Sequence, residues 1–198
     1  MINFIKGFLK SGANSRVKLY LPPGIIEEKV SKINKRKYFK GHFIVSGRWD
    51  LDLIKMTDSG TYNNMKVLYN CSNGYNIDDF EKIYKEKLSK GRPFNHNGTI
   101  LSDEKKIRWY TNYCIDLFES LKDGYNVSKE NSPIGIAITR DGKPVKAYNG
   151  RHRLSVAQIL NLEEIMVQLQ YVHMDYIYNE NGFESLNNIL VKNGWESI

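Results

Sequence analysis

Three basic side chains stand side by side where the sequence predicts the start of a helix. The run AYNGRHRLSVAQIL, residues 147–160, places Arg151, His152 and Arg153 in the first helical turn. The first turn of a helix carries unpaired N–H groups and a partial positive charge, so cationic side chains there are unfavourable by roughly 0.3 to 1 kcal/mol each. A bound anion would remove this conflict, because backbone N–H groups and guanidinium groups both match phosphate oxygens. The pattern therefore predicts a phosphate-binding site.

The neighbouring residues extend this predicted site. Asn149 is expected to cap the helix, and Gly150 forms the short turn that connects a strand to it. His152 is also a candidate catalytic residue, because its charge can change near neutral pH. We expect the phosphates of a nucleotide to contact six residues of this turn, namely Asn149, Gly150, Arg151, His152, Arg153 and Ser155. The alternative is that both arginines point into solvent and that His152 is a packing residue.

Phosphoryl transfer also needs a carboxylate that accepts the hydroxyl proton of the substrate or holds Mg²⁺. The segment GRWD, residues 47–50, follows an apolar run that is typical of a strand. Asp50 is the first candidate for the catalytic carboxylate and Asp52 the second, and both are candidate Mg²⁺ ligands. Arg48 or Lys55 is a candidate ligand of the outer phosphates, and Trp49 or Tyr148 is a candidate for stacking on a base or sugar. The alternative role for Asp50 is that of a cap or turn residue.

The last third of the chain predicts the elements that position the GRHR turn. Residues 134–138 alternate as a strand, a turn follows at 141–142, and a second strand completes a hairpin. A helix is expected over 150–161, another strand from Ile165 and a last amphipathic helix over 183–192. A strand that leads directly into a helix aims the N–H groups of the first turn outward, where an anion can bind.

The middle of the chain predicts two helices separated by a loop. Apolar residues at helical spacing predict one helix over 78–91 and a longer one over 102–124. Residues 91–101 between them are expected to form an exposed loop. His96 in this loop and His173 after the last strand are candidate substrate contacts.

Composition indicates a folded, basic protein. The 198 residues are 41% hydrophobic and 12% aromatic, and a formal net charge of +7 is spread over the whole length, which permits a nucleic-acid partner without requiring one. Cys71 and Cys114 form no CxxC pattern, which argues against a disulfide framework or a cysteine zinc site and favours the cytoplasm. No apolar run is long enough to cross a bilayer. Apolar residues within 2–9 share one helical face, which predicts either weak peripheral membrane contact or packing on the domain.

The GRHR turn and its flanking strands resemble a known superfamily. The runs IGIAITRDGKPVK, 134–146, and AYNGRHRLSVAQILNLEEIMVQLQYVH, 147–173, resemble the core of the ParB/sulfiredoxin superfamily. Gly150, His152 and Arg153 match the family's turn, which binds nucleotide phosphates. The chain is most similar to uncharacterised ParB-like proteins of polysaccharide gene sets, and the free serine kinases share the scaffold.

The resemblance implies an α+β fold in which a small mixed sheet packs against helices. It implies one domain over 1–198, with an N-terminal helix at 1–15, a helical insertion at 76–125 and a nucleotide-binding core at 133–173.

Two departures from the family narrow the chemistry. Arg151 occupies the position of the sulfiredoxin cysteine, which excludes sulfinic acid reduction through that thiol. Arg151 also replaces the ParB glutamate, and nothing in the sequence resembles a helix-turn-helix for centromere binding. Both observations argue against a chromosome-partition ParB. Arg48 and Asn149 stand where the ParB-like proteins of polysaccharide gene sets commonly carry acids.

The residues and the resemblance together predict an ATP-dependent phosphotransferase that acts on a small molecule, for example a sugar or glycan-precursor hydroxyl, with Mg²⁺ entering with the nucleotide. One alternative is a ParB-like nuclease or nucleic-acid-binding module. It is disfavoured because the aromatic residues are not interleaved with a basic stripe. Another alternative is a non-enzymatic protein whose interactions are gated by a nucleotide.

Overall fold

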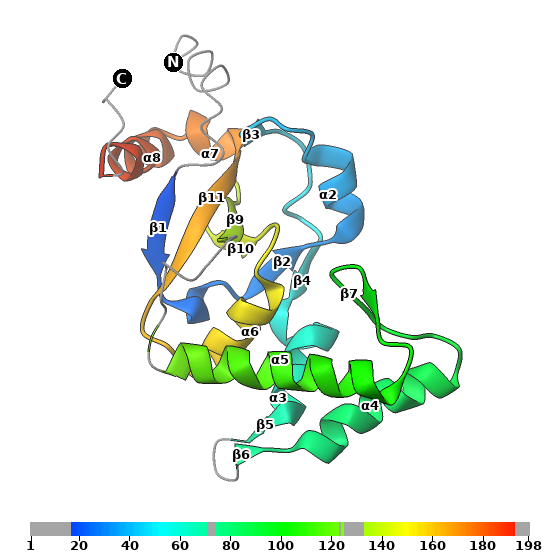
Figure 1. The fold of residues 1–198 in the computed structure, drawn as a ribbon. Coiled ribbons are helices and arrows are strands. Elements are labelled where there is room, and N and C mark those ends of the chain that lie inside the picture. The colour runs from blue at the N-terminus through cyan, green and yellow to red at the C-terminus, as the bar shows by residue number, and fades with distance from the viewer. Residues whose placement is uncertain (1–16, 71–73, 123, 125–132, 193–198) are drawn as a thin grey trace.

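A mixed β-sheet forms the centre of the computed structural model, which describes residues 17–70, 74–122, 124 and 133–192 (Figure 1). The strands follow the order β1-β11-β9-β10-β2-β4, and β3 pairs with β11. Their bounds are β1 Lys18–Leu21, β2 Glu28–Val30, β3 Ile44–Val45, β4 Leu53–Lys55, β9 Ile134–Ile138, β10 Pro144–Lys146 and β11 Ile165–His173. β11 is parallel to β9 and antiparallel to β1, whereas β10 is antiparallel to β9 and parallel to β2. The fold is therefore α+β, and the predicted class is confirmed.

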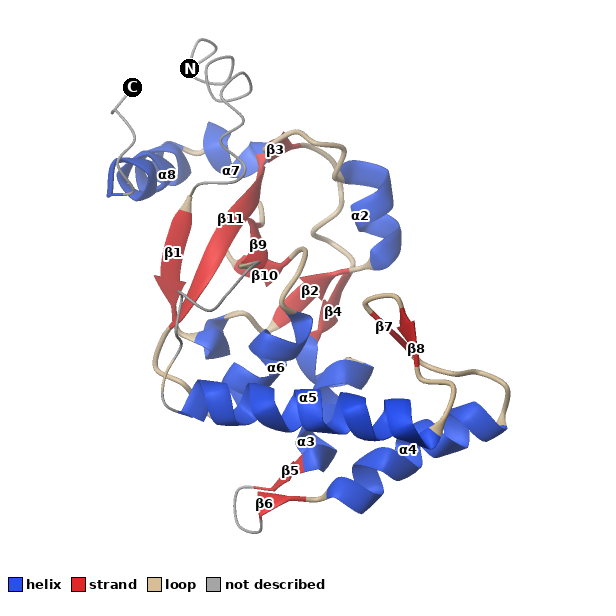
Figure 2. Cartoon of the chain, viewed as in Figure 1, coloured by secondary structure: helices blue, strands red, loops and turns tan. Residues whose placement is uncertain are grey.

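Helices gather at two ends of this sheet. Figure 2 shows α3, α4 and α5 together below the sheet and α7 and α8 at its other end. The helices are α2 Lys32–Tyr38, α3 Gly60–Leu68, α4 Ile77–Ser89, α5 Glu104–Lys122, α6 Arg151–Ile159, α7 Met174–Tyr178 and α8 Glu180–Lys192, with short 3-10 turns at Pro23–Ile25 and Met56–Asp58. Two small hairpins, β5 Tyr69–Asn70 with β6 Gly74–Tyr75 and β7 Asn95–His96 with β8 Thr99–Ile100, extend from the helical layer.

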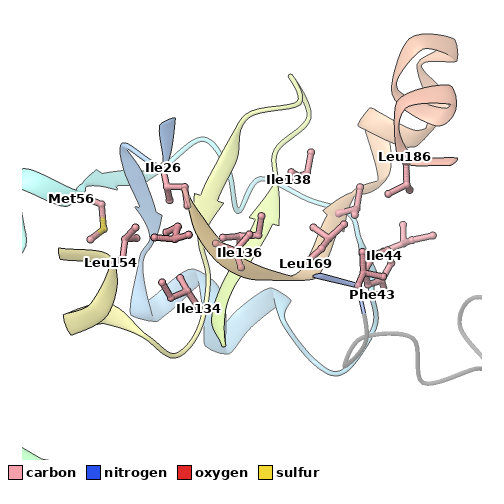
Figure 3. Close-up of a cluster of buried hydrophobic side chains, with 14 of the residues drawn as sticks. Ile26, Phe43, Ile44, Met56, Ile134, Ile136, Ile138, Leu154, Leu169 and Leu186 are labelled. Atoms are coloured by element: carbon pink, nitrogen blue, oxygen red, sulfur yellow. The ribbon is translucent and has the colours of Figure 1, made fainter. Parts of the chain in front are cut away.

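Helix α6 is buried on two sides, which fixes the position of its first turn. Leu154 and Ala157 belong to the hydrophobic cluster of the sheet, which also contains Ile134, Ile136 and Leu169 (Figure 3). On the other side, Val156 belongs to a second cluster formed mainly by α4 and α5. Because both clusters exclude water from α6, the helix cannot shift without opening one of them.

The two middle helices follow the apolar spacing of the sequence. α4 and α5 begin and end within two residues of the predicted 78–91 and 102–124. α5 buries Tyr110, Cys114 and Phe118 at spacings of four residues, as the periodic pattern requires. At its start, the Asp103 carboxylate accepts a hydrogen bond of 2.9 Å from the Lys106 N–H, which satisfies one of the free donors of the first turn.

The segment 91–101 differs from its prediction. It contains the β7–β8 hairpin, and His96 is only 5% exposed rather than lying in an open loop. The His96 ring packs against the rings of Tyr113 and His152, with centroids 4.8 and 5.0 Å away. Most residues of the segment are exposed, as its polarity predicted, but tertiary contacts with aromatic rings bury His96.

Two predictions concern parts of the chain outside the described residues. The expected N-terminal helix over 1–15 and the proposed membrane contact through 2–9 both fall there. Of the helices that the structure describes, none has the length and apolar character required to cross a membrane.

Candidate functional site

The first turn of α6 is held in place by the hairpin that precedes it. Gly135 of β9 donates its N–H to Tyr148 O at 2.7 Å and accepts the Ala147 N–H at 2.8 Å. The chain then turns through two left-handed residues, Asn149 with φ 52° and Gly150 with φ 63°, before α6 begins. Gly150 is the N-cap and no side chain caps the helix, so the predicted capping role of Asn149 is wrong. The left-handed backbone of Asn149 explains this, because an N-cap side chain normally acts from extended backbone.

Gly150 also lacks room for a side chain. A Cβ atom there would lie 2.6 Å from Ile134 Cγ1 and 3.0 Å from Ile134 Cα. The turn that presents the start of α6 therefore requires glycine for both its backbone angle and its close contact with β9.

We expect Gly150→Ala to lower the free energy of unfolding by about 2 kcal/mol or more, from the left-handed backbone and the contact with Ile134. Urea unfolding measures this loss. The matched control is Gly91→Ala, because Gly91 has a similar φ of 65° and nothing within 4 Å of the added Cβ. Equal losses in the two variants would show that the contact with Ile134 has no effect.

A polar cavity of about 400 Å³ opens at the start of α6. We call it the α6 cavity. It is lined by Lys35, Asn95, His96, Asn97, Tyr113, Lys146, Ala147, Tyr148, Asn149, Gly150, Arg151, His152 and Arg153. Two lysines, two arginines and two histidines face this space, and none of the described residues that line it is an aspartate or glutamate. The cavity is therefore strongly electropositive.

Lys146 is the most unusual group of the α6 cavity. Lys146 is only 4% exposed. Its ammonium group forms no ion pair and no hydrogen bond with any residue that the structure describes. Burial, followed by the positive charges of Lys35, Arg151 and Lys29, lowers the pKa of Lys146 to about 7. Buried lysines are ordinarily paired with an acid, so this one lacks the partner that its environment calls for.

Lys35 of α2 shows the same effect from the opposite wall. Burial, followed by the charges of Lys29 and Arg151, lowers its pKa to about 8. Its ammonium group lies 5.2 Å above the Tyr148 ring, so its neighbour is an aromatic face rather than a carboxylate. The positive charge of Arg151 contributes to the lowered pKa of both lysines and of His96.

His152 is held neutral at the inner wall of the α6 cavity. Burial, followed by the charges of His96, Arg151 and Lys146, lowers its pKa to about 3. Its Nε2 lies 2.8 Å from Tyr110 Oη, so the nitrogen that faces α5 is already hydrogen-bonded. The ring can therefore present only Nδ1 to a ligand.

Ser155 is placed away from the α6 cavity. Its residue is fully buried, and its hydroxyl donates to Arg151 O at 3.0 Å, one turn earlier in the helix. The structure thus brings together five of the six phosphate contacts predicted within the turn, whereas the Ser155 hydroxyl is occupied inside the helix.

Asp50 forms a buried ion pair with Arg140 instead of lining the α6 cavity. Arg140 Nε donates to Asp50 Oδ2 at 2.9 Å, Nη2 donates to Oδ1 at 2.8 Å, and the Arg140 N–H donates to Oδ2 at 3.0 Å. Burial alone would raise the pKa of Asp50, but these bonds and the nearby His173 lower it below its ordinary value. Such a carboxylate is fully occupied by its own protein.

The hairpin separates this ion pair from the α6 cavity. Gly150 lies beside Ile134 at the start of β9, whereas Arg140 follows Ile138 at the end of that strand. A strand rises about 3.3 Å per residue, so the two places are on the order of 15 Å apart. The structure therefore does not bring Asp50 together with the GRHR turn.

The other predicted residues of the GRWD region also lie away from the α6 cavity. Trp49 is fully buried, its ring lies edge-on to Phe39 with centroids 5.2 Å apart, and its indole N–H points to Val45 O at 3.4 Å, so it cannot stack on a ligand. Arg48 and Asp52 are exposed and line none of the cavities described here. Within the described residues there is no group of three or more His, Cys, Asp or Glu side chains that could hold a metal ion.

His173 has a structural role. It is fully buried, its Nε2 lies 2.8 Å from Gly47 O, and its Nδ1 accepts the Asp175 N–H at 3.0 Å at the start of α7. Both ring nitrogens are occupied, which leaves none for a substrate.

Lys146 and Tyr113 of the α6 cavity were missed by sequence reasoning. They come from β10 and α5, which meet only in the folded chain. The one available signal was a lysine inside the strand that leads to the GRHR turn.

Comparisons with protein-family models, curated proteins and solved structures found no match. The resemblance to the ParB/sulfiredoxin superfamily therefore stays a prediction that rests on the residues of the turn.

Proposed function

We propose that the protein is a nucleotide-dependent phosphotransferase that binds the phosphates of ATP in the α6 cavity and acts on a small molecule. The observation that carries this proposal is Lys146, a cation that is 4% exposed, lacks an acidic partner among the described residues and lines a cavity with two arginines. A bound phosphate chain supplies the missing negative charge. The uncapped start of α6 adds backbone N–H donors at the same place.

The shape of the surface next to the α6 cavity supports a nucleotide rather than free phosphate. A second hollow of about 340 Å³ is lined by Tyr148, Asn149, Gln170 and Tyr171, and it shares Tyr148 and Asn149 with the α6 cavity. A ligand whose phosphates occupy the α6 cavity can therefore extend its nucleoside over two tyrosines. Tyrosine rings are common partners of bases and sugars.

The residues of the α6 cavity would share the work of phosphoryl transfer. ATP supplies the phosphoryl group, and Lys146, Arg151 and Arg153 would hold its charge and orient it. His152 is the neutral group through which a proton of the acceptor hydroxyl would leave, in the tautomer whose Nε2–H donates to Tyr110. In the ligand-free protein, cationic neighbours help to hold the pKa of His152 at about 3. Bound phosphates would offset these positive charges and so raise this pKa.

Magnesium has no protein ligand in this account. The described residues that line the α6 cavity supply no carboxylate, and the earlier candidates Asp50 and Asp52 lie elsewhere. This lack of an acid favours one second candidate, a protein that binds the nucleotide and changes its interactions without transferring phosphate. A nucleic-acid duplex is a poorer ligand, because its backbone cannot reach a lysine that is 4% exposed.

Thermal unfolding with ATP, ADP and adenosine tests the proposal. We expect ATP and ADP to raise the Tm, by an amount that corresponds to about 2.7 kcal/mol at a hundredfold excess over Kd, and adenosine to raise it much less. His152→Asn is expected to keep this stabilisation and to lose phosphoryl transfer by at least about a hundredfold.

The outcomes separate the candidates. Stabilisation by ATP without formation of a phosphorylated product from any hydroxyl compound would favour the non-enzymatic protein. No stabilisation by any nucleotide would contradict both.

A further inference from the structure

A second, smaller cavity lies on the other side of Arg151. It has a volume of about 190 Å³, and we call it the α3 cavity because the first turn of α3 lines it. The polar residues that line it are Lys29, Ser59, Thr61, Asn64, Lys87 and Arg151. Arg151 lines both cavities, so molecules bound in the two spaces would share this guanidinium group.

Cations also dominate the α3 cavity. Lys29, Lys87 and Arg151 face it, and none of the three forms an ion pair with another described residue. Burial and then Arg151 lower the pKa of Lys29, while the more distant charge of Asp58 opposes this effect. The Lys87 ammonium group faces aromatic rings, since its Nζ lies 5.1 Å from the centre of the Tyr84 ring and 5.7 Å from that of Phe94. No aspartate or glutamate is among the described residues that line the space.

Ser59 provides an independent sign of a ligand. Its residue is 2% exposed, and its Oγ accepts a long bond of 3.5 Å from the Tyr62 N–H at the start of α3. The hydroxyl donates no hydrogen bond to any residue that the structure describes, so its proton lacks an acceptor in a buried position. The N–H groups of Gly60 and Thr61 lie in the same first turn of this nine-residue helix. Hydroxyl, N–H and cationic donors thus surround one small space, and no carboxylate of the described residues lines it.

We propose that the α3 cavity binds a phosphate monoester group. The space is smaller than the roughly 300 Å³ of ordinary ligand pockets, so it suits a single tetrahedral group rather than a nucleotide. Two or three cations, a hydroxyl donor and a helix start match the dianionic charge of phosphate better than the single charge of a carboxylate.

This inference rests on the proposed function and narrows its substrate. With nucleotide phosphates in the α6 cavity and a phosphate group in the α3 cavity, Arg151 would lie between the donor and the acceptor. The acceptor would then be a small molecule that already carries a phosphate, and the α3 cavity would hold that phosphate while its hydroxyl points toward Arg151.

The test uses the full chain with saturating ADP, so that the α6 cavity is filled, and follows the Tm as inorganic phosphate is added at constant ionic strength. We expect phosphate to raise the Tm further, with an apparent Kd that becomes about tenfold weaker in Lys87→Met, because one charge-assisted contact is lost. Lys82→Met is the matched control, since Lys82 lies on α4 but does not line the cavity. It should bind phosphate as the wild type does.

Three results would overturn the inference while the proposed function stands. The first is that ADP binds but phosphate gives no further stabilisation. The second is an equal affinity for phosphate in Lys87→Met and wild type. The third is equal stabilisation by acetate, which would assign the cavity to carboxylates. Failure of ADP to bind would instead contradict the proposed function itself.

Discussion

Lys146→Met is expected to stabilise the ligand-free protein at pH 7 by about 2 kcal/mol and to abolish stabilisation by ATP. Burial and neighbouring cations lower the pKa of Lys146 from 10.5 to about 7, and one pKa unit corresponds to about 1.4 kcal/mol. The full shift sets an upper limit of about 5 kcal/mol, which relaxation of the side chain and water entry reduce. Methionine fills a similar volume without a charge. A gain in stability with loss of binding is the signature of a group retained for function.

The pH dependence of this gain has a definite sign. The unfolded chain keeps Lys146 protonated up to about pH 10.5, whereas the folded chain releases the proton near pH 7. Between these values the unfolded state binds more protons, so the stability of the wild type rises with pH. The advantage of Lys146→Met is therefore complete below pH 7 and shrinks toward pH 10. Urea unfolding at pH 7 and 9.5 measures it.

Lys143→Met is the matched control for this experiment. Lys143 belongs to the same hairpin, but its side chain is 72% exposed and its nearest acid, Asp141, lies 3.1 Å away. We expect its effect on stability to stay within about 0.5 kcal/mol and ATP binding to be unchanged. A destabilised Lys146→Met that still binds ATP would contradict the role of Lys146 as a phosphate ligand.

Asp50→Asn is expected to destabilise the protein by about 2 to 3 kcal/mol and to leave nucleotide affinity within about twofold of the wild type. The Asp50 side chain is 1% exposed and accepts three hydrogen bonds from Arg140, one of them from the backbone. Asparagine removes the charge that these donors require. Because the ion pair lies at the far end of the β9–β10 hairpin, the α6 cavity should not change.

Asp52→Asn is the control, because Asp52 is exposed and should tolerate the change without loss of stability. Urea unfolding and ATP titration of both variants decide between two roles for Asp50. Unchanged stability with loss of phosphoryl transfer would make Asp50 the catalytic carboxylate that the sequence first suggested.

The position of the GRHR turn at the start of a helix was predictable because its signals are local. The cationic first turn, the glycine before it and the strand that precedes it are contiguous, so Gly150, Arg151 and Arg153 line one cavity as expected. The helices α4 and α5 were equally predictable, because their apolar faces repeat along the chain.

The partners of the turn were not predictable from spacing. Lys35 and Tyr113 reach the α6 cavity through the packing of α2 and α5, which no local pattern encodes. The acidic side chain of Asp50 after a strand-like run indicates a catalytic carboxylate, but its partner Arg140 lies ninety residues away in the sequence. Local sequence signals therefore located a turn that lines a cavity, but they did not show which distant residues meet it.

Proton uptake on ATP binding tests the central claim most directly. Isothermal titration at pH 8, in two buffers that differ in ionisation enthalpy, measures the protons taken up by the complex. Lys146, with a pKa of about 7, is mostly neutral at this pH, and bound phosphates would restore its charge. We expect an uptake of about one to one and a half protons per ATP bound, about one at Lys146 and up to half at Lys35, whose pKa of about 8 leaves it half neutral at this pH. Binding of ATP without proton uptake, or no binding at all, would contradict the assignment of the α6 cavity as a phosphate site built around Lys146.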